Sequence, residues 1–286
     1  MTRLTIHHET RYSYERPVRF SQHRLLLRPR DSHALRVIEA RLSLSPPGET
    51  RWVYDALGNC VCLFEPGGEA RSLIIVSRLV TERFPAPLSP DDPGTGMPVA
   101  YGLEDRTVLA PFIAPATEAD GGALQEWLRS LTGAPGEPAL DLLMRMTGAI
   151  HQGFEYRERQ VAGVQTPGQT LRLRSGACRD FAWLMIEALR RLGFAARFVS
   201  GYVNGGGARR GAGATHAWVD VFLPDLGWTE FDPTNGLAES ADLIRIAVAR
   251  TPREAAPVSG AILGDPGRAE LTVGVMVSSE TAAVAA

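Results

Sequence analysis

Three residues in the second half of the chain have the types and the order that nucleophilic catalysis requires. Cys178 lies in "RSGACRDFAWLMIEALRRLGF", His216 follows 38 residues later in "THAWVDVF", and Asp232 a further 16 residues later in "WTEFDPTNG". A thiolate can attack a carbonyl carbon, an imidazole can carry the proton, and a carboxylate can orient the imidazole. The pattern predicts a Cys–His–Asp site for acyl transfer.

Cys178 stands at the start of a predicted helix. Apolar residues recur behind it at spacings of three and four, which is typical of a helix with one buried face. The unpaired backbone N–H groups of a helix start stabilise a thiolate, and they can also hold a developing oxyanion. Taken alone, a cysteine at this place is more often a small core residue, so its interpretation depends on the other two positions.

His216 begins one predicted strand and Asp232 ends the next, directly before Pro233, which cannot continue a strand ladder. The turn "LPDLG" between them predicts an antiparallel hairpin that brings the two side chains together. Taken alone, His216 could be a half-buried strand residue, and Asp232 could cap a turn together with Asn235. The ordered set of three favours the catalytic interpretation.

Three blocks that contain these residues resemble a known family. "SGACRDFAWLMIEALRRLGFAARFVSGYV", "THAWVDVFLPDLGW" and "EFDPTNG" resemble the signature blocks of the transglutaminase-like superfamily, and its bacterial members most closely. The family places its catalytic Cys, His and Asp at Cys178, His216 and Asp232. The segments "HHETRYSYERPV" and "DALGN" resemble the β-rich N-terminal region of those proteins. The resemblance implies a papain-like core, with a cysteine-bearing helix packed on an antiparallel sheet that carries His and Asp.

The order of segments predicts an α+β protein. Residues 1–85 contain short β-rich segments separated by turns, which predicts a β-sandwich-like N-terminal domain. Residues 86–115 are rich in Pro, Gly and Asp and are predicted to be a linker. Residues 116–286 run from helices to strands, and they are predicted to form a papain/transglutaminase-like catalytic core with C-terminal strands.

Five further residues are predicted to contact a substrate: Gln169, Trp183, Trp218, Arg209 and Arg210. The glutamine amide could join the backbone N–H of Cys178 in binding an oxyanion. The two tryptophans, with Trp228, could line an amine channel that excludes water. The two arginines lie in the Gly-rich segment 204–215, a predicted lid, and could attract an acidic substrate. Ordinary roles in packing, loop polarity and solubility remain open for all five.

Hydrolysis of a peptide or amide bond by a protease or amidase is the favoured reaction, through a thioester at Cys178. A protein-glutamine transglutaminase, which uses an amine acceptor, is one alternative. A non-catalytic peptide-binding module is another, and the complete Cys–His–Asp set argues against it. A metal site on Cys178 and His216 lacks paired ligand spacings. No metal or cofactor is therefore predicted, and the expected partner is a peptide or protein.

The composition limits the kinds of partner and the location that can be expected. The net charge of −2 provides no strong field for nucleic acid or membranes, and no apolar run approaches the roughly 20 residues of a membrane span. The N-terminus alternates like a strand and lacks a signal peptide's apolar core, which predicts a cytoplasmic protein. All 30 basic residues are arginine, so the chain has no lysine amine of its own. The oligomeric state stays open.

Overall fold

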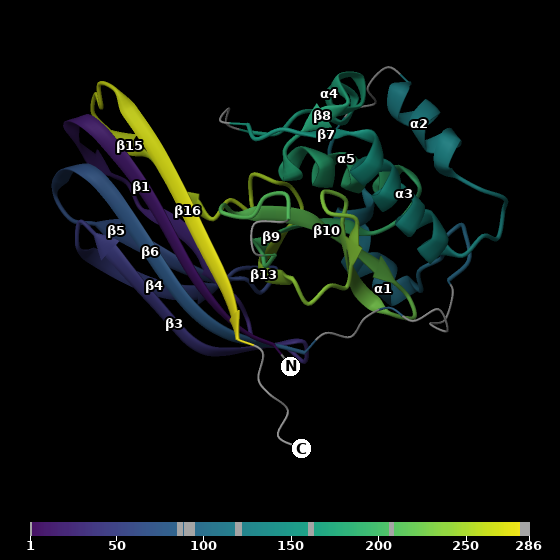
Figure 1. The fold of residues 1–286 in the computed structure, drawn as a ribbon, viewed down its shortest axis with the longest axis horizontal. Coiled ribbons are helices and arrows are strands. Elements are labelled where there is room, and N and C mark those ends of the chain that lie inside the picture. The colour runs from purple at the N-terminus through teal and green to yellow at the C-terminus, as the bar shows by residue number, and fades with distance from the viewer. Residues whose placement is uncertain are drawn as a thin grey trace.

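The structure is a computed structural model that describes residues 2–84, 88, 95–117, 122–159, 163–205 and 209–280. It has two lobes that lie against each other, a β-sandwich and a mixed helix and sheet core (Figure 1). Within these described ranges, all strand pairs are antiparallel except the short β7–β8 pair (Glu155–Tyr156 with Ser175–Gly176). The predicted α+β class is confirmed, with the sandwich before the core along the chain.

The sandwich follows from period-two alternation in its strands, which buries every second side chain. In β1, for example, Leu4, Ile6, His8 and Thr10 are buried and their neighbours are not. One sheet has the order β15-β1-β6-β3, with β16 also beside β1, and the other has the order β14-β2-β5-β4. The strands are β1 (Thr2–Phe20), β2 (His23–Arg28), β3 (Leu35–Ser45), β4 (Gly48–Tyr54), β5 (Cys60–Pro66), β6 (Glu69–Arg83), β14 (Val258–Ser259), β15 (Ile262–Leu263) and β16 (Ala269–Glu280).

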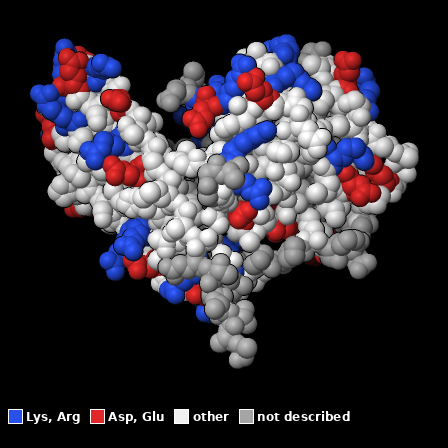
Figure 2. Space-filling model, in the orientation of Figure 1, with Lys and Arg blue, Asp and Glu red and all other residues white. Residues whose placement is uncertain are grey.

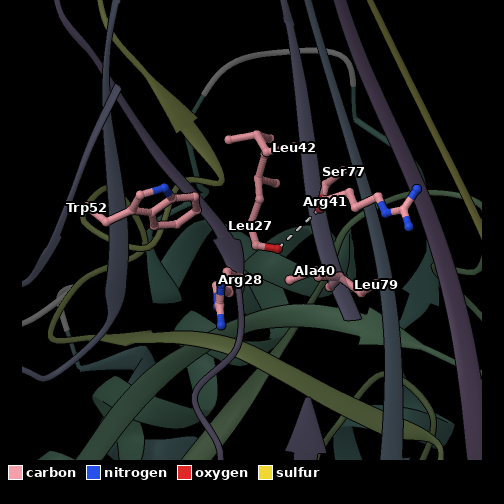
Figure 3. Close-up of a pocket in the computed structure, with 8 residues that line it drawn as sticks. All are labelled: Leu27, Arg28, Ala40, Arg41, Leu42, Trp52, Ser77 and Leu79. Atoms are coloured by element: carbon pink, nitrogen blue, oxygen red, sulfur yellow. Dashed lines mark hydrogen bonds between the residues drawn. The ribbon is translucent and has the colours of Figure 1, made fainter. Parts of the chain in front are cut away.

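The two sheets of the sandwich pack closely. Figure 3 shows a gap between them, with β2 and β4 on one side and β3 and β6 on the other. Its volume is about 30 Å³, the size of a single water molecule. The Ser77 hydroxyl donates to the Leu27 carbonyl across this gap at 3.4 Å. The gap is therefore a packing defect between sheets and too small for a substrate.

The core is built on a second antiparallel sheet with the order β12-β11-β10-β9-β13. No helix among the described residues is long and apolar enough to cross a membrane. The elements of this lobe are α1 (Leu103–Ile113), α2 (Ala123–Leu131), α3 (Ala139–Gly153), β7 (Glu155–Tyr156), α4 (Pro167–Leu173), β8 (Ser175–Gly176), α5 (Cys178–Arg191), β9 (Ala196–Val203), β10 (His216–Leu223), β11 (Gly227–Asp232), β12 (Leu237–Ala238) and β13 (Leu243–Ala249).

Helix α5 is the central helix of the core. Nearly all of its side chains are buried, from Cys178 to Arg190, because it packs on β9 and β10 on one side and on helices on the other. Glu187, in the C-terminal half of this helix, is buried and binds both Arg190 and Arg191 at 3.0 Å. A buried carboxylate is stable only when it is paired in this way. Both pairs lie within the helix, and Arg190 in turn donates to the Ala196 carbonyl of β9 at 2.9 Å, which ties α5 to the sheet.

The lobes differ from the predicted segments at two places. Residues 103–113, inside the predicted linker, form helix α1, which buries Leu109 and Phe112 against the core. Strand β16 pairs with β1 over the whole run from Arg3–Glu280 to Tyr14–Ala269. The C-terminal strand thus completes the N-terminal sheet and does not extend the core sheet. The predicted linker residues 86, 87 and 89–94 lie outside the described residues.

Asn59 joins the two lobes, because its side chain makes the two hydrogen bonds that a residue of a neighbouring strand would make. Its side-chain amide donates to the Val248 carbonyl at 2.7 Å, and its side-chain oxygen accepts from the Val248 N–H at 2.8 Å. Asp55 holds Asn59 in place, since its carboxylate accepts from both the backbone and the side-chain N–H groups of Asn59. The turn "DALGN" in the sandwich therefore satisfies both backbone groups of a residue in β13 of the core.

Replacing Asn59 with Ala should lower the free energy of unfolding by about 2–3 kcal/mol, because two buried backbone groups lose their partners. Urea denaturation of the full chain measures this value. Gln22→Ala is the control, since the Gln22 side chain makes an exposed hydrogen bond to Glu65. It should change the value by less than about 0.5 kcal/mol. Equal stabilities of the two variants would show that Asn59 does not join the lobes.

Candidate active site

The N-terminus of α5 presents Cys178 at the end of the core sheet. Cys178 is the first helical residue and 8% of its surface is exposed. Asp180 fixes this end, because its carboxylate accepts from the Ala177 N–H at 2.8 Å and from the Gln165 N–H at 2.7 Å. Arg159 pairs with the same carboxylate at 2.7 Å. The cysteine thus stands, as predicted, at a helix start that is braced by a buried ion pair.

His216 and Asp232 are brought together by the β10–β11 hairpin, as the spacing predicts. The His216 Nε2 and Asp232 Oδ2 atoms lie 2.8 Å apart, and neither side chain is exposed. Asp232 is the last residue of β11, and the chain turns away at Pro233. The hairpin therefore holds imidazole and carboxylate in a fixed, dry contact.

Asn235 completes this contact and was not among the predicted site residues. Its side-chain amide donates to Asp232 Oδ2 at 2.8 Å and lies 3.5 Å from His216 Nε2. Its side-chain oxygen accepts from the Arg210 N–H at 2.9 Å. The other carboxylate oxygen of Asp232 accepts from the Thr234 N–H. The turn "DPTNG" therefore caps its own backbone and supports the carboxylate at once.

The electrostatics of the pair follow from this geometry. Burial by itself would lower the pKa of His216, but the Asp232 carboxylate and then the Cys178 side chain raise it to about 10. Burial would raise the pKa of Asp232, but His216 and the donors around it hold that pKa below its usual range. At neutral pH the pair is an imidazolium beside a carboxylate. Such a cation can stabilise a thiolate and can later protonate a leaving group.

The second ring nitrogen of His216, Nδ1, is the atom free to exchange a proton. It is buried and has no partner with normal hydrogen-bond geometry among the described residues. The Cys178 side chain is nevertheless close enough to raise the pKa of His216 through hydrogen bonding and charge. Gly211 lies on the same side of the ring, where an added Cβ would stand 2.7 Å from Nδ1, and its φ is +82°. The chain there needs glycine to pack against the imidazole.

Tyr156 is a second residue at the site that was not predicted. It pairs with Gly176 in the parallel β7–β8 ladder, two residues before Cys178. Burial, and then the charge of Cys178, raise the pKa of its hydroxyl. Tyr156 therefore remains protonated beside the thiol and is half-buried next to it. Its only sequence signal is an aromatic residue in a two-residue strand, which is too weak for prediction.

The side chains of Gln169, Trp183 and Trp218, which are predicted to contact a substrate, all make contacts within the protein. Gln169 serves the capping box of α4, where its side-chain oxygen accepts from the Thr166 N–H at 2.9 Å. Trp183 is buried in the core beneath the Arg190 guanidinium. Trp218 is fully buried, and its ring lies 5.8 Å from that of His216. Trp218 thus supports the imidazole from behind, since a fully buried ring cannot reach a substrate.

The two loop arginines are also engaged elsewhere. Arg209 pairs with Asp242 at 2.9 Å. Arg210 donates to the His151 carbonyl at 3.2 Å, and its backbone binds Asn235. The described part of the predicted lid is therefore anchored to the core at both arginines, and residues 206–208 lie outside the described residues. No group of three side chains suited to bind a metal occurs in the ranges that the structure describes.

Comparison with known proteins shows first which fold the chain has and then which family it belongs to. The fold matches that of a proposed cysteine protease from Cytophaga hutchinsonii with a TM-score of 0.78 and 21% identity, over 99% of this chain and 92% of that one. Residues 4–82 match the bacterial transglutaminase-like N-terminal region, and residues 125–233 match the transglutaminase-like superfamily core. The chain belongs to the transglutaminase-like superfamily.

Two relatives cover different shares of the chain. An uncharacterized protein of Mycobacterium tuberculosis is 29% identical over 297 residues, which are 96% of this chain and 92% of that protein. A protein-glutamine gamma-glutamyltransferase of Pseudomonas aeruginosa is 34% identical over 126 residues, which are 41% of this chain and 18% of that protein. The first similarity extends through both lobes, whereas the second concerns less than half of the chain.

Asp232→Asn should lower the pKa of His216 by at least about one unit, since it removes the strongest of the interactions that raise this pKa and leaves burial to lower it. NMR titration of the imidazole measures the change. In the unsubstituted protein the ring should stay protonated through pH 8. Asp242→Asn, at the half-buried partner of Arg209, is the matched control and should leave the titration unchanged. An unshifted titration in Asp232→Asn would contradict the assigned cause.

Proposed function

We propose that the protein is a cysteine-dependent hydrolase of peptide or amide bonds. The observation that carries this proposal is the buried His216–Asp232 contact of 2.8 Å, with a His216 Nδ1 that has no hydrogen-bond partner of normal geometry among the described residues and lies near Cys178. Membership of the transglutaminase-like superfamily supports a cysteine-dependent enzyme. A nucleophile, a base and an orienting carboxylate are the three groups that acyl transfer through a covalent intermediate needs.

In the proposed reaction the Cys178 thiolate attacks the carbonyl carbon of the substrate. The backbone N–H of Cys178 at the helix start is placed to stabilise the oxyanion that forms. The carbon–nitrogen bond then breaks, and the His216 imidazolium protonates the departing amine, which leaves a thioester. Water attacks the thioester carbonyl while His216 accepts its proton, and the carbon–sulfur bond then breaks to release the Cys178 thiolate. The products are an amine and a carboxylic acid, and the Cys178–His216 pair is restored.

Water is favoured over an amine as the acyl acceptor. Transfer to an amine requires a channel that keeps water out. The tryptophans that could line such a channel are packed elsewhere: Trp183 and Trp218 are buried, and Trp228 lies 3.8 Å from the Arg197 guanidinium and beside Phe112 and Phe222. The relative from Pseudomonas aeruginosa favours the second candidate, transfer of the acyl group of a glutamine side chain to an amine, with release of ammonia.

We also propose a peptide or protein as the substrate and the cytoplasm as the location. The support for the location is that Cys60, Cys62 and Cys178 are all free thiols, as a reducing compartment would keep them. The support for a peptide substrate is the amide chemistry for which the site is suited. No metal or cofactor takes part in the proposed steps.

Cys178→Ala should reduce amide turnover by at least about 10³-fold without unfolding the protein, because the covalent step is lost. Mass spectrometry of peptide mixtures, incubated with and without a primary amine, separates cleavage, deamidation and amine incorporation. Because the chain contains no lysine, its own side chains supply no competing amine acceptor. Cys60→Ala is the control, since burial raises the pKa of the Cys60 thiol and it should not affect turnover. Full turnover by Cys178→Ala would refute the proposal, and amine incorporation as the main product would favour transfer.

A further inference from the structure

We propose that the hydroxyl of Tyr156 is the second donor that stabilises the oxyanion formed when the Cys178 thiolate attacks a carbonyl group. The inference deepens the proposed function and rests on it for the acyl-transfer chemistry at Cys178. In the attack a carbon–sulfur bond forms, and one electron pair of the carbon–oxygen double bond moves to the oxygen. That oxygen then accepts hydrogen bonds from the Cys178 N–H and the Tyr156 O–H.

The site needs a donor besides the Cys178 N–H. Oxyanion holes use preorganised backbone N–H groups and side chains, and removal of one donor costs about 10²–10³ in rate. At the start of α5, the Ala177 N–H is already used by the Asp180 carboxylate at 2.8 Å. Gln169, the side chain predicted for this role, is engaged in the capping box of α4. The second donor must therefore come from another element.

Tyr156 faces the first turn of α5. In the β7–β8 ladder it pairs with Gly176, and paired residues of neighbouring strands share one face. A side chain on this face meets α5, since a Cβ added at Gly176 would lie 2.9 Å from Asp180 Cβ and 3.3 Å from the Phe181 ring. Tyr156 accordingly packs against the hydrophobic cluster that contains Cys178.

The residues on either side of Tyr156 face the opposite way. Glu155 and Arg157 are both more than half exposed and pair with each other at 2.6 Å. Figure 2 shows charged side chains of both signs on this end of the core lobe, where Figure 1 places β7, β8 and α4. Because successive residues of an extended chain point to opposite faces, Tyr156 is turned inward.

The Tyr156 hydroxyl is free to bind a substrate atom. It makes no hydrogen bond with any described residue, and it is not among the fully buried polar atoms that lack a partner in that part of the chain. Solvent therefore reaches this hydroxyl, and Cys178 is 8% exposed, whereas the side chains of His216 and Asp232 have no exposure. A carbonyl group that approaches Cys178 from solvent thus reaches Tyr156 and the thiol first.

Tyr156 acts as a donor and not as a base. Burial, and then the charge of Cys178, raise the pKa of its hydroxyl, so the proton stays on the oxygen at neutral pH. The charge of Asp232 acts in the same direction but more weakly, as expected of a hydroxyl on the thiol side of the site. A neutral phenol can donate to an oxyanion without adding a charge of its own.

The test compares two reactions of Cys178 that differ in whether an oxyanion forms. Acylation by p-nitrophenyl acetate passes through an oxyanion, whereas alkylation by iodoacetamide is a displacement at a saturated carbon and forms none. Tyr156→Phe, which removes only the hydroxyl, should slow acylation at least about tenfold and leave the alkylation rate within about twofold. Stopped-flow absorbance of p-nitrophenolate and mass spectrometry of alkylated Cys178 measure the two rates in the full chain.

Tyr14→Phe is the matched control. Tyr14 is also half-buried and its hydroxyl makes no hydrogen bond with the described residues, but it lies in the sandwich beside Phe20. Both rates should stay unchanged in this variant. Equal acylation rates in Tyr156→Phe and the unsubstituted chain would overturn the proposal. A parallel loss of acylation and alkylation in a folded Tyr156→Phe chain would also overturn it, because Tyr156 would then control the thiol and not the oxyanion.

A measurement on the unsubstituted chain decides if Tyr156→Phe melts early. Acetaldehyde adds to the Cys178 thiol as a hemithioacetal, whose oxygen takes the place of the oxyanion. In protein labelled with ¹³C at tyrosine Cζ, the Tyr156 resonance should shift when the adduct forms, and the Tyr14 resonance should not. Formation of the adduct without a shift at Tyr156 would overturn the proposal.

The oxyanion donor and the proposed hydrolysis can fail separately. Acylation of Cys178 that depends on Tyr156, in a chain that turns over no peptide or amide, would support the donor and refute the hydrolysis. Amide turnover that Cys178→Ala abolishes and Tyr156→Phe leaves intact would support the hydrolysis and overturn the donor. An unsubstituted chain that is not acylated at Cys178 would overturn both.

Discussion

The buried contact between His216 and Asp232 is the interaction on which the site depends. A carboxylate without exposure is stable only if its charge is paired and its oxygens accept hydrogen bonds. Here His216, Asn235 and the Thr234 N–H meet that requirement. Asn235 is in turn held by the backbone of Arg210. The hairpin, the turn after β11 and the loop before β10 are thus organised around one ion pair, which also leaves Nδ1 for the thiol.

The same strand that ends at Asp232 ties the core to the sandwich. Glu230 of β11 pairs with Arg245 of β13 at 3.0 Å and with Arg83, at the end of β6, at 3.6 Å. Arg245 also forms an ion pair with Asp220 of β10, and the Trp218 indole donates a hydrogen bond to Glu230. These groups are largely buried, so each charge needs the others. The N-terminal lobe therefore supplies one of the cations that stabilise β11, which explains how a β-sandwich can matter to a site in the other lobe.

Much of the site could be predicted because its signals are local. The apolar stripe behind Cys178 specifies a helix, and Pro233 and the spacing from His216 specify a hairpin. The rest depends on contacts between distant residues. Arg209 and Arg210 are used by Asp242 and His151, which lie 33 and 59 positions away. The β16–β1 pairing joins opposite ends of the chain, and nothing in a strand's own sequence reveals its neighbour or its register. The sequence does not reveal the contact of Asn235 with Asp232, because an asparagine at this position is equally typical of a residue that caps a turn.

The most direct measurement of the central claim is the covalent intermediate. When the protein is mixed with a p-nitrophenyl ester, it should release a rapid burst of about one p-nitrophenol per chain before steady turnover. Peptide mapping of the quenched protein should then find the acyl group on Cys178, and His216→Ala should abolish the burst. A burst that survives His216→Ala, or an acyl group on any other residue, would contradict an account in which the buried His216–Asp232 pair activates Cys178.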